Sequence, residues 1–425
     1  MKREERLQFI WKNSLLPGSS LKTNCGLRVE VIHPGEQNPN AGPDFFNARI
    51  KLGSLVWAGN VEMHHLASNW NHHGHHLDPA YDNVILHVVH RLDALTKNSK
   101  GRTIPTLDID PSKLQITLPD NLSSYENWLP CHLSFPHVSK NSLKPWLETL
   151  YIERLNKQVH LASRILERFP HNRDKALFLT LASGFGLPIN RLPFEIMASG
   201  IPLPLLLDVK ESPSYLEALL FGHSGLLNKS NIQDPYTNQL LTQYTRLKVT
   251  LPGNPLPPHL WKFLRIRPAS FPTLRLSQFA SFIHSHFPLD EDLMNFESLK
   301  KLEQSLRQNA SEYWNTHYIF GRASPHSVKT MGTQAIQHLI INAIIPYLRA
   351  IDLVDHRSNI QRSEKERLLK ISAESNQIVR NWSKFGVKAA NAVESQALIQ
   401  LYKGYCTEQR CDQCRLGNIS RESFL

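Results

Sequence analysis

Two predicted strands near the N-terminus constrain the fold most strongly. Residues 43–52 and 55–65 are extended runs joined by a Gly-Ser turn signal at 53–54, so they predict an antiparallel hairpin. Asp44 begins the first strand, and Glu62 lies late in the second. We therefore expect both carboxylates at the same edge of one sheet.

Side-chain alternation along the second strand separates polar from apolar residues. Asn60, Glu62 and His64 point to one face, whereas Val61 and Met63 point to the other. Hard oxygen ligands gathered at a sheet edge suit Mg²⁺ or Mn²⁺. The pattern therefore predicts a divalent-metal site of the hydrolytic kind.

The order of elements around this hairpin is α-β-β-β-α-β. Residues 4–16 have helical apolar spacing, and residues 27–33 alternate as a half-buried strand. After the hairpin, the His-rich residues 66–81 leave room for a helix, and residues 84–89 form an apolar run that indicates a strand covered on both faces. We expect an α+β domain with a mixed sheet over residues 1–115.

This order, with Pro-Asp on the second strand and Glu-x-His on the third, resembles the PD-(D/E)XK phosphodiesterase superfamily of restriction-endonuclease-like nucleases. The resemblance covers about the first 110 residues. It implies that Asp44 and Glu62 bind the metal and that an acid of the first helix, Glu5 or Glu4, joins them. His64 occupies the position of the superfamily's lysine. A largely neutral imidazole there implies a general base or a further ligand.

Other interpretations of these residues remain open. Asp44 is also typical of a turn at the start of a strand, and Glu62 of a solvated sheet face. Along its whole length the chain further resembles an uncharacterised bacterial family, through stretches such as residues 40–46, 81–87 and 267–268. That second resemblance implies no activity.

Histidines are concentrated in the same region, which holds nine of the chain's 21 within its first 90 residues. The His-x-x-x-His spacing at 72–76 invites a zinc interpretation, but Gly74 argues against a rigid helix there. We expect a polar loop or lid beside the carboxylates. His75, Asp78 and Asp82 are candidates for contacting phosphate or a second metal.

Three cysteines bunch near the C-terminus as Cys406-x4-Cys411-x2-Cys414. Packing explains such bunching in a polar stretch poorly, whereas metal ligation explains it well. Cys131 is the preferred fourth ligand of a Zn²⁺ site or an iron–sulfur cluster, and Cys25 or a histidine is an alternative. Some PD-(D/E)XK nucleases have an iron–sulfur cluster of similar layout. Free thiols or a redox pair remain the simpler alternative.

A formal charge of +11 and an isoelectric point near 9.4 favour an anionic partner. Cations and aromatic residues interleave over 261–275, where Lys262, Arg265, Arg267 and Arg275 are candidates for binding a nucleic-acid backbone. Arginines that bridge a loop to helix ends are the ordinary alternative. DNA is favoured over RNA as the partner.

The rest of the chain is expected to be mainly helical. After a linker at 116–142, a large helical domain is expected over 143–425, with helical periodicity at 143–169, 364–385 and 389–404 and a buried helix at 334–348. The sequence contains neither a membrane-spanning apolar run nor a signal peptide, so we expect a cytoplasmic location.

The sequence thus predicts metal-dependent phosphodiester hydrolysis of nucleic acid. The alternative is a nucleic-acid-binding or scaffold protein whose nuclease-like fold has no catalytic activity. The position of His64, where a lysine is expected, is the feature that favours this alternative.

Overall fold

The computed structural model describes residues 3–12, 16, 21–38, 42–110, 128–129, 140–227, 234–264, 266–288, 299–356 and 361–416. The chain divides into two compact units. The first comprises residues 1–123 and 262–266, and the second comprises residues 124–261 and 267–425. The boundary lies within residues 111–127, outside the described residues, as does most of the expected linker.

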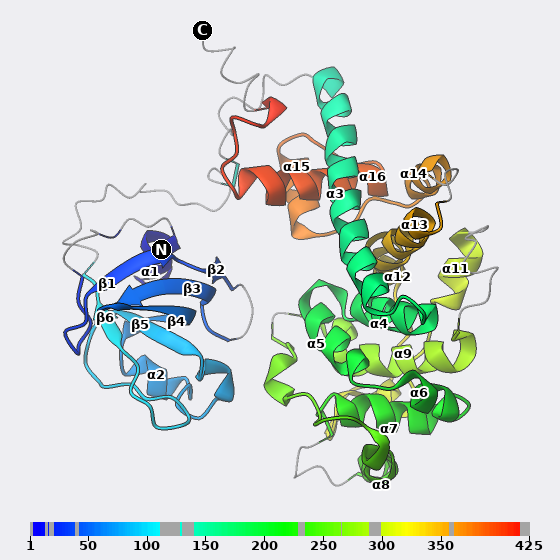
Figure 1. Ribbon diagram of the computed structural model, residues 1–425, viewed down its shortest axis with the longest axis horizontal. Coiled ribbons are helices and arrows are strands. Elements are labelled where there is room, and N and C mark those ends of the chain that lie inside the picture. The colour runs from blue at the N-terminus through cyan, green and yellow to red at the C-terminus, as the bar shows by residue number, and fades with distance from the viewer. Residues whose placement is uncertain are drawn as a thin grey trace. The chain divides into compact units, whose positions relative to one another are not determined.

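A six-stranded mixed sheet forms the centre of the first unit (Figure 1). Its strands are β1 (Val29–His33), β2 (Glu36–Gln37), β3 (Phe45–Leu52), β4 (Leu55–Leu66), β5 (Val84–Arg91) and β6 (Thr106–Asp108). The order is β1-β3-β4-β5-β6, with β2 paired to β3. Pairing is antiparallel from β1 to β4 and parallel from β4 to β6. The expected hairpin is confirmed, with Leu52 opposite Leu55 across its turn.

The two faces of the sheet have separate apolar clusters. Leu7 and Trp11 of α1 (Arg3–Lys12) belong to the larger cluster, which includes Val61 and Met63 of β4. A smaller cluster contains Trp70 of α2 (Asn69–His72) and Tyr81 of η1 (Pro79–Tyr81), together with Val84 and Ile104. The face that carries Asn60, Glu62 and His64 therefore lies under the α2 segment, and the opposite face packs against α1.

The segment between β4 and β5 is less helical than expected. Only the four residues of α2 and the three of η1 are helical. Gly74 has a φ of 76°, a left-handed conformation that does not continue a right-handed helix, and Pro79 begins the 3-10 turn. The expected α+β class with a mixed sheet is nevertheless confirmed.

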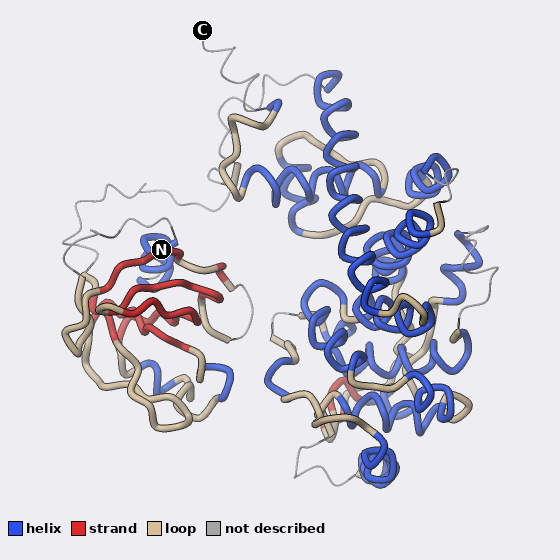
Figure 2. Tube along the Cα trace, in the orientation of Figure 1, coloured by secondary structure: helices blue, strands red, loops and turns tan. Residues whose placement is uncertain are grey.

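The second unit is mainly helical (Figure 2). Its helices are α3 (Lys140–Arg168), α4 (Arg173–Phe185), α5 (Leu187–Ser199), α6 (Leu203–Val209), α7 (Pro213–His223), α8 (Pro235–Leu247), α9 (Pro272–His286), α11 (Leu299–Ser305), α12 (Thr333–Leu339), α13 (Ile345–Val354), α14 (Gln361–Leu369), α15 (Gln377–Lys384) and α16 (Ala392–Leu401). It also contains a two-stranded sheet of β7 (His317–Ile319) and β8 (Arg322–Ala323).

Most expected helices of this unit are present, with one correction. The buried run expected at 334–348 is present as α12, a π-helical turn at Ile340–Ile344, and α13. The periodic stretch 364–385 is instead two helices, α14 and α15. The Asn376 side chain accepts a hydrogen bond from the backbone N–H of Val379 at 3.0 Å, which caps the start of α15.

No single helix in the described part of the chain has the length and apolarity that a bilayer span requires. Among the residues that the structure describes, one bent pair, α5 with α6 at 93°, satisfies the same criterion of length and composition.

Candidate metal centre

A β-bulge brings the two carboxylates to the same face. Phe45 pairs with Val61 but Ala48 pairs with Gly59, so β3 has one extra residue there. Asn47, with a φ of 56°, adopts the left-handed conformation within this bulge. Because strand side chains alternate between faces, the extra residue moves the preceding positions to the opposite face. Phe45 thereby points into the core, and Asp44 lies on the same side as Glu62.

Asp44 and Glu62 are joined by a direct hydrogen bond. The backbone N–H of Asp44 donates to Oε2 of Glu62 at 2.9 Å. In return, Oδ2 of Asp44 accepts from the backbone N–H of Met63 at 3.0 Å, and Oδ1 accepts from Nε2 of Gln8 at 2.9 Å. The carboxylates therefore link β3, β4 and α1, and Asp44 and Glu62 lie close together.

Burial disfavours the ionised form of both carboxyl groups. Burial, with repulsion from Glu62 and Glu4, raises the pKa of Asp44 to about 7. The pKa of Glu62, a residue only 5% exposed, rises to about 8, again because of burial and the charge of Glu4. A divalent cation between these oxygens would remove the repulsion, so the pair fits the hard ion expected from the sequence.

The acid that α1 contributes to this environment is Glu4. Its Oε1 accepts a hydrogen bond from the backbone N–H of His65 at 3.3 Å, and its charge raises the pKa of Asp44 and Glu62. The predicted helix acid Glu5 is also in α1, but its side chain lies outside the described residues.

His64 is buried on the same face, between two other histidines. Its Nδ1 is 2.9 Å from Nε2 of His87, and its Nε2 is 3.1 Å from Nδ1 of His73. Burial and the neighbouring rings lower the pKa of His64 to about 2. A neutral imidazole with so low a pKa accepts a proton poorly but keeps a lone pair for a metal. Both roles considered for His64, general base and further ligand, stay predictions.

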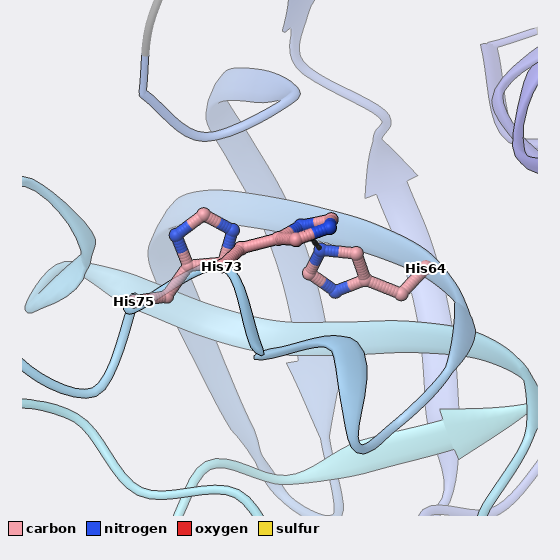
Figure 3. A group of neighbouring side chains, drawn as sticks. All are labelled: His64, His73 and His75. Carbon is pink, nitrogen blue, oxygen red and sulfur yellow. Dashed lines mark hydrogen bonds between the residues drawn. The ribbon is translucent and has the colours of Figure 1, made fainter. Parts of the chain in front are cut away.

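The segment after α2 brings two further histidines close to His64 (Figure 3). His73 and His75 flank the left-handed Gly74, and one ring nitrogen from each lies within 4.8 Å of the others and of His64. Oε1 of Glu62 is 3.5 Å from Nε2 of His64 and 3.4 Å from Nε2 of His75. Glu62 therefore adjoins two of the three clustered histidines.

Aromatic residues hold the His75 ring in place. Tyr81 stacks on His75 with ring centroids 3.8 Å apart, and Trp70 meets it edge to face at 5.4 Å. Nε1 of Trp70 donates to the backbone oxygen of Lys97 at 2.9 Å. Burial lowers the pKa of His75 to about 4 and that of His87 to about 3, so both rings are neutral at pH 7.

Sequence reasoning did not assign a role in the site to His73 or His87, and it gave His75 a looser one. His87 is the register partner of Glu62 on β5, so pairing β4 with β5 in parallel would have revealed it. The sequence predicts that Asp78 and Asp82 contact phosphate or a second metal. In the structure both side chains have nearby partners: Asp78 caps η1, and Asp82 accepts hydrogen bonds from Ser99.

The residues predicted to bind nucleic acid do not share one environment. Lys262 is partly buried in the first unit, whereas Arg267 is exposed and precedes η5 (Pro268–Ser270) in the second. Arg275 is buried in α9, where it donates to Gln278 at 2.8 Å and burial lowers its pKa to about 10. Arg275 therefore belongs to the interior of the protein, and the prediction that it binds nucleic acid at the surface is wrong. Arg265 lies outside the described residues.

The C-terminal thiols are not assembled as a metal site in the described part of the chain. Cys406 and Cys411 are partly exposed, Cys414 is buried, and their sulfur atoms do not form a trio within 4.8 Å of one another. Cys131 lies outside the described residues. Ligation by these cysteines stays a prediction.

One known protein family matches most of the chain. The family described as Protein of unknown function (DUF2851) matches residues 4–377. The chain belongs to the DUF2851 family. All the residues of the centre lie in the part that matches DUF2851, whereas the three clustered cysteines follow it. Neither the curated proteins nor the solved structures include a significant match to this DUF2851 member.

Proposed function

We propose that this protein hydrolyses phosphodiester bonds of nucleic acid with a divalent cation held by Asp44 and Glu62. The observation that carries the proposal is the pair of carboxylates, Glu62 buried and Asp44 partly buried, that backbone hydrogen bonds link between β3 and β4. The order α1, β1, β3, β4, the α2 segment and β5 on a mixed sheet agrees with the restriction-endonuclease-like core that the sequence resemblance implies.

In this proposal each side chain has a defined task. Bound Mg²⁺ or Mn²⁺ would lower the pKa of a coordinated water and offset the charge that develops on the phosphate. Asp44 and Glu62 hold the cation, and Gln8 fixes the orientation of the Asp44 carboxylate. His64 contributes a neutral nitrogen at the same face and is not assigned the proton transfer.

The substrate class follows from overall charge. A net charge of +11 favours a polyanion, and DNA is the first substrate to test. A second candidate function is binding of nucleic acid without cleavage. It is favoured by His64, because the position that supplies a fixed positive charge in related nucleases here has a neutral ring.

The test is cleavage of labelled single- and double-stranded DNA and RNA with Mg²⁺ or Mn²⁺. Wild-type protein is compared with Glu62→Gln and with the control Glu30→Gln, whose side chain is exposed on β1. We expect metal-dependent cleavage that falls at least about a hundredfold in Glu62→Gln alone. Binding without cleavage by the wild type would select the second candidate, and equal cleavage by both variants would exclude the proposed site.

A further inference from the structure

We infer that His64, His73, His75 and Glu62 form a tetrahedral site for a transition-metal ion of the Zn²⁺ class. The inference deepens the proposed function and rests on it because Glu62 and His64 of β4 serve both sites. It differs in the ion and in two ligands, His73 and His75, which belong to the segment after α2.

Three distances between ligand atoms are close to those of a tetrahedron around zinc. Zinc–nitrogen bonds of about 2.0–2.1 Å place neighbouring ligand atoms of a tetrahedron roughly 3.3 Å apart. Nε2 of His64 lies 3.1 Å from Nδ1 of His73 and 3.5 Å from Oε1 of Glu62. Nε2 of His75 lies 3.4 Å from the same oxygen. The three histidine nitrogens lie within 4.8 Å of one another, and Glu62 adjoins two of them.

The chemistry of the ligands selects the class of metal. Three imidazole nitrogens and one carboxylate oxygen suit Zn²⁺, Co²⁺ or Ni²⁺, whereas Mg²⁺ prefers oxygen ligands and water. Because Zn²⁺ accepts four-coordinate geometry readily, it is the best match to this compact set.

A hydrogen-bonded row of histidines would be a simpler explanation, but it accounts for only part of the cluster. It satisfies His64 and His73, which contact each other. Nε2 of His75, a residue only 8% exposed, has no hydrogen-bond partner among the described residues although it faces Oε1 of Glu62. Buried polar atoms are rarely left in this way, and a metal ion would satisfy this nitrogen.

The surroundings of His64 resemble the support that metal-bound histidines usually have. When Nδ1 of His64 donates to Nε2 of His87, the lone pair of His64 is on Nε2, which faces Glu62 and His73. A ligand histidine commonly makes such a bond through its second nitrogen. His87 is fully buried on β5, so it can fix the tautomer and the orientation of the His64 ring.

The experiment titrates metal-free, full-length protein with Co²⁺ and then with Zn²⁺, using the visible absorption of cobalt and calorimetry. His73→Ala is the test variant because the His73 side chain is exposed and its loss should leave the core intact. His72→Ala, at the neighbouring exposed position on α2, is the matched control.

We expect one Co²⁺ per chain with the intense spectrum of tetrahedral cobalt, displaced by Zn²⁺. Affinity should fall at least about tenfold in His73→Ala and remain unchanged in His72→Ala. No binding by the wild type, an octahedral spectrum, or equal affinity in both variants would overturn the inference.

Cleavage assays on the same samples separate the two proposals. Tetrahedral binding without cleavage of any nucleic acid would retain the metal site and remove the proposed function. Mg²⁺-dependent cleavage that survives in His73→Ala, together with unchanged Co²⁺ affinity, would retain the function and remove the site.

Discussion

The side chain of Glu62 has a different neighbour on each carboxylate oxygen. Oε2 accepts the backbone N–H of Asp44, whereas Oε1 faces His64 and His75. One residue therefore borders both the carboxylate pair and the histidine set. Replacing it should affect either proposed ion, while replacing His73 should affect only the second.

At the residue scale, the raised pKa of Glu62 predicts a pH dependence of the metal-free protein. Its pKa is about 8 in the folded state against an ordinary 4.5, so the folded state holds a proton that the unfolded state has lost. Its contribution is therefore present at low pH and disappears as pH rises through about 8. We expect the free energy of unfolding to fall between about pH 4.5 and pH 8, by up to about 1.4 kcal/mol per pH unit, and to level off above pH 8.

Urea unfolding in the presence of a chelator measures this slope. Glu62→Gln should have a shallower slope than wild type over pH 5–8, and Glu30→Gln, at an exposed position of β1, should match wild type. If Glu62→Gln retains the full slope, proton release from Glu62 is not its source.

At the element scale, strand alternation and the Gly-Ser turn are enough to predict the hairpin and the neighbourhood of Asp44 and Glu62. The bulge at Asn47 could not be predicted, because Phe45 and Phe46 are adjacent and the sequence does not indicate which of them faces the core. The prediction for Arg275 is wrong because a mixed aromatic and basic stretch is typical of a surface, although helix α9 buries it.

The histidines after α2 illustrate a second limit of the sequence. His73 and His75 flank Gly74. A glycine at this position predicts that the segment is not a rigid helix, so the sequence does not predict metal ligands at helical spacing. The left-handed turn at Gly74 is instead what places both rings near Glu62. Such a turn depends on packing of Trp70 and Tyr81 against the sheet, which involves residues distant in the sequence.

The conformation of Gly74 yields a prediction for this loop. Gly74 and Gly101 both have a φ of 76°, and at neither position does a described atom lie within 4 Å of the place that an added Cβ would occupy. Alanine should therefore cost about 1–2 kcal/mol at either site through backbone strain alone. We expect Gly74→Ala to weaken Co²⁺ binding by about fivefold or more, since about 1.4 kcal/mol is tenfold, and Gly101→Ala to leave it unchanged.

Calorimetric titration of both variants with Co²⁺ checks this expectation. Thermal unfolding of each variant tests whether the two substitutions destabilise the protein equally. Equal Co²⁺ affinities in Gly74→Ala and Gly101→Ala would mean that the loop conformation does not determine ligation.

At the scale of the whole molecule, each unit has its own apolar core, and the candidate centre belongs entirely to the first unit. An ion that binds only the folded first unit should stabilise that unit alone. At a free concentration one hundred times its dissociation constant, the gain is about 2.7 kcal/mol.

Differential scanning calorimetry with and without Zn²⁺ tests this expectation. We expect one unfolding transition to move to higher temperature while the transition of the helical unit stays in place, and we expect no movement in His73→Ala. A shift of both transitions by the same amount, or a shift that persists in His73→Ala, would assign the stabilisation to other residues.

The segment after α2 also has a consequence for the exchange of a bound ion. Glu62 and His64 belong to β4, which is paired with β3 on one side and with β5 on the other. His73 belongs to the connection between β4 and β5 and is exposed, so it can move without breaking that ladder, whereas Tyr81 and Trp70 hold His75 in place. An ion would meet three ligands already in place and one that closes over it, so it could enter and leave while the sheet remains intact.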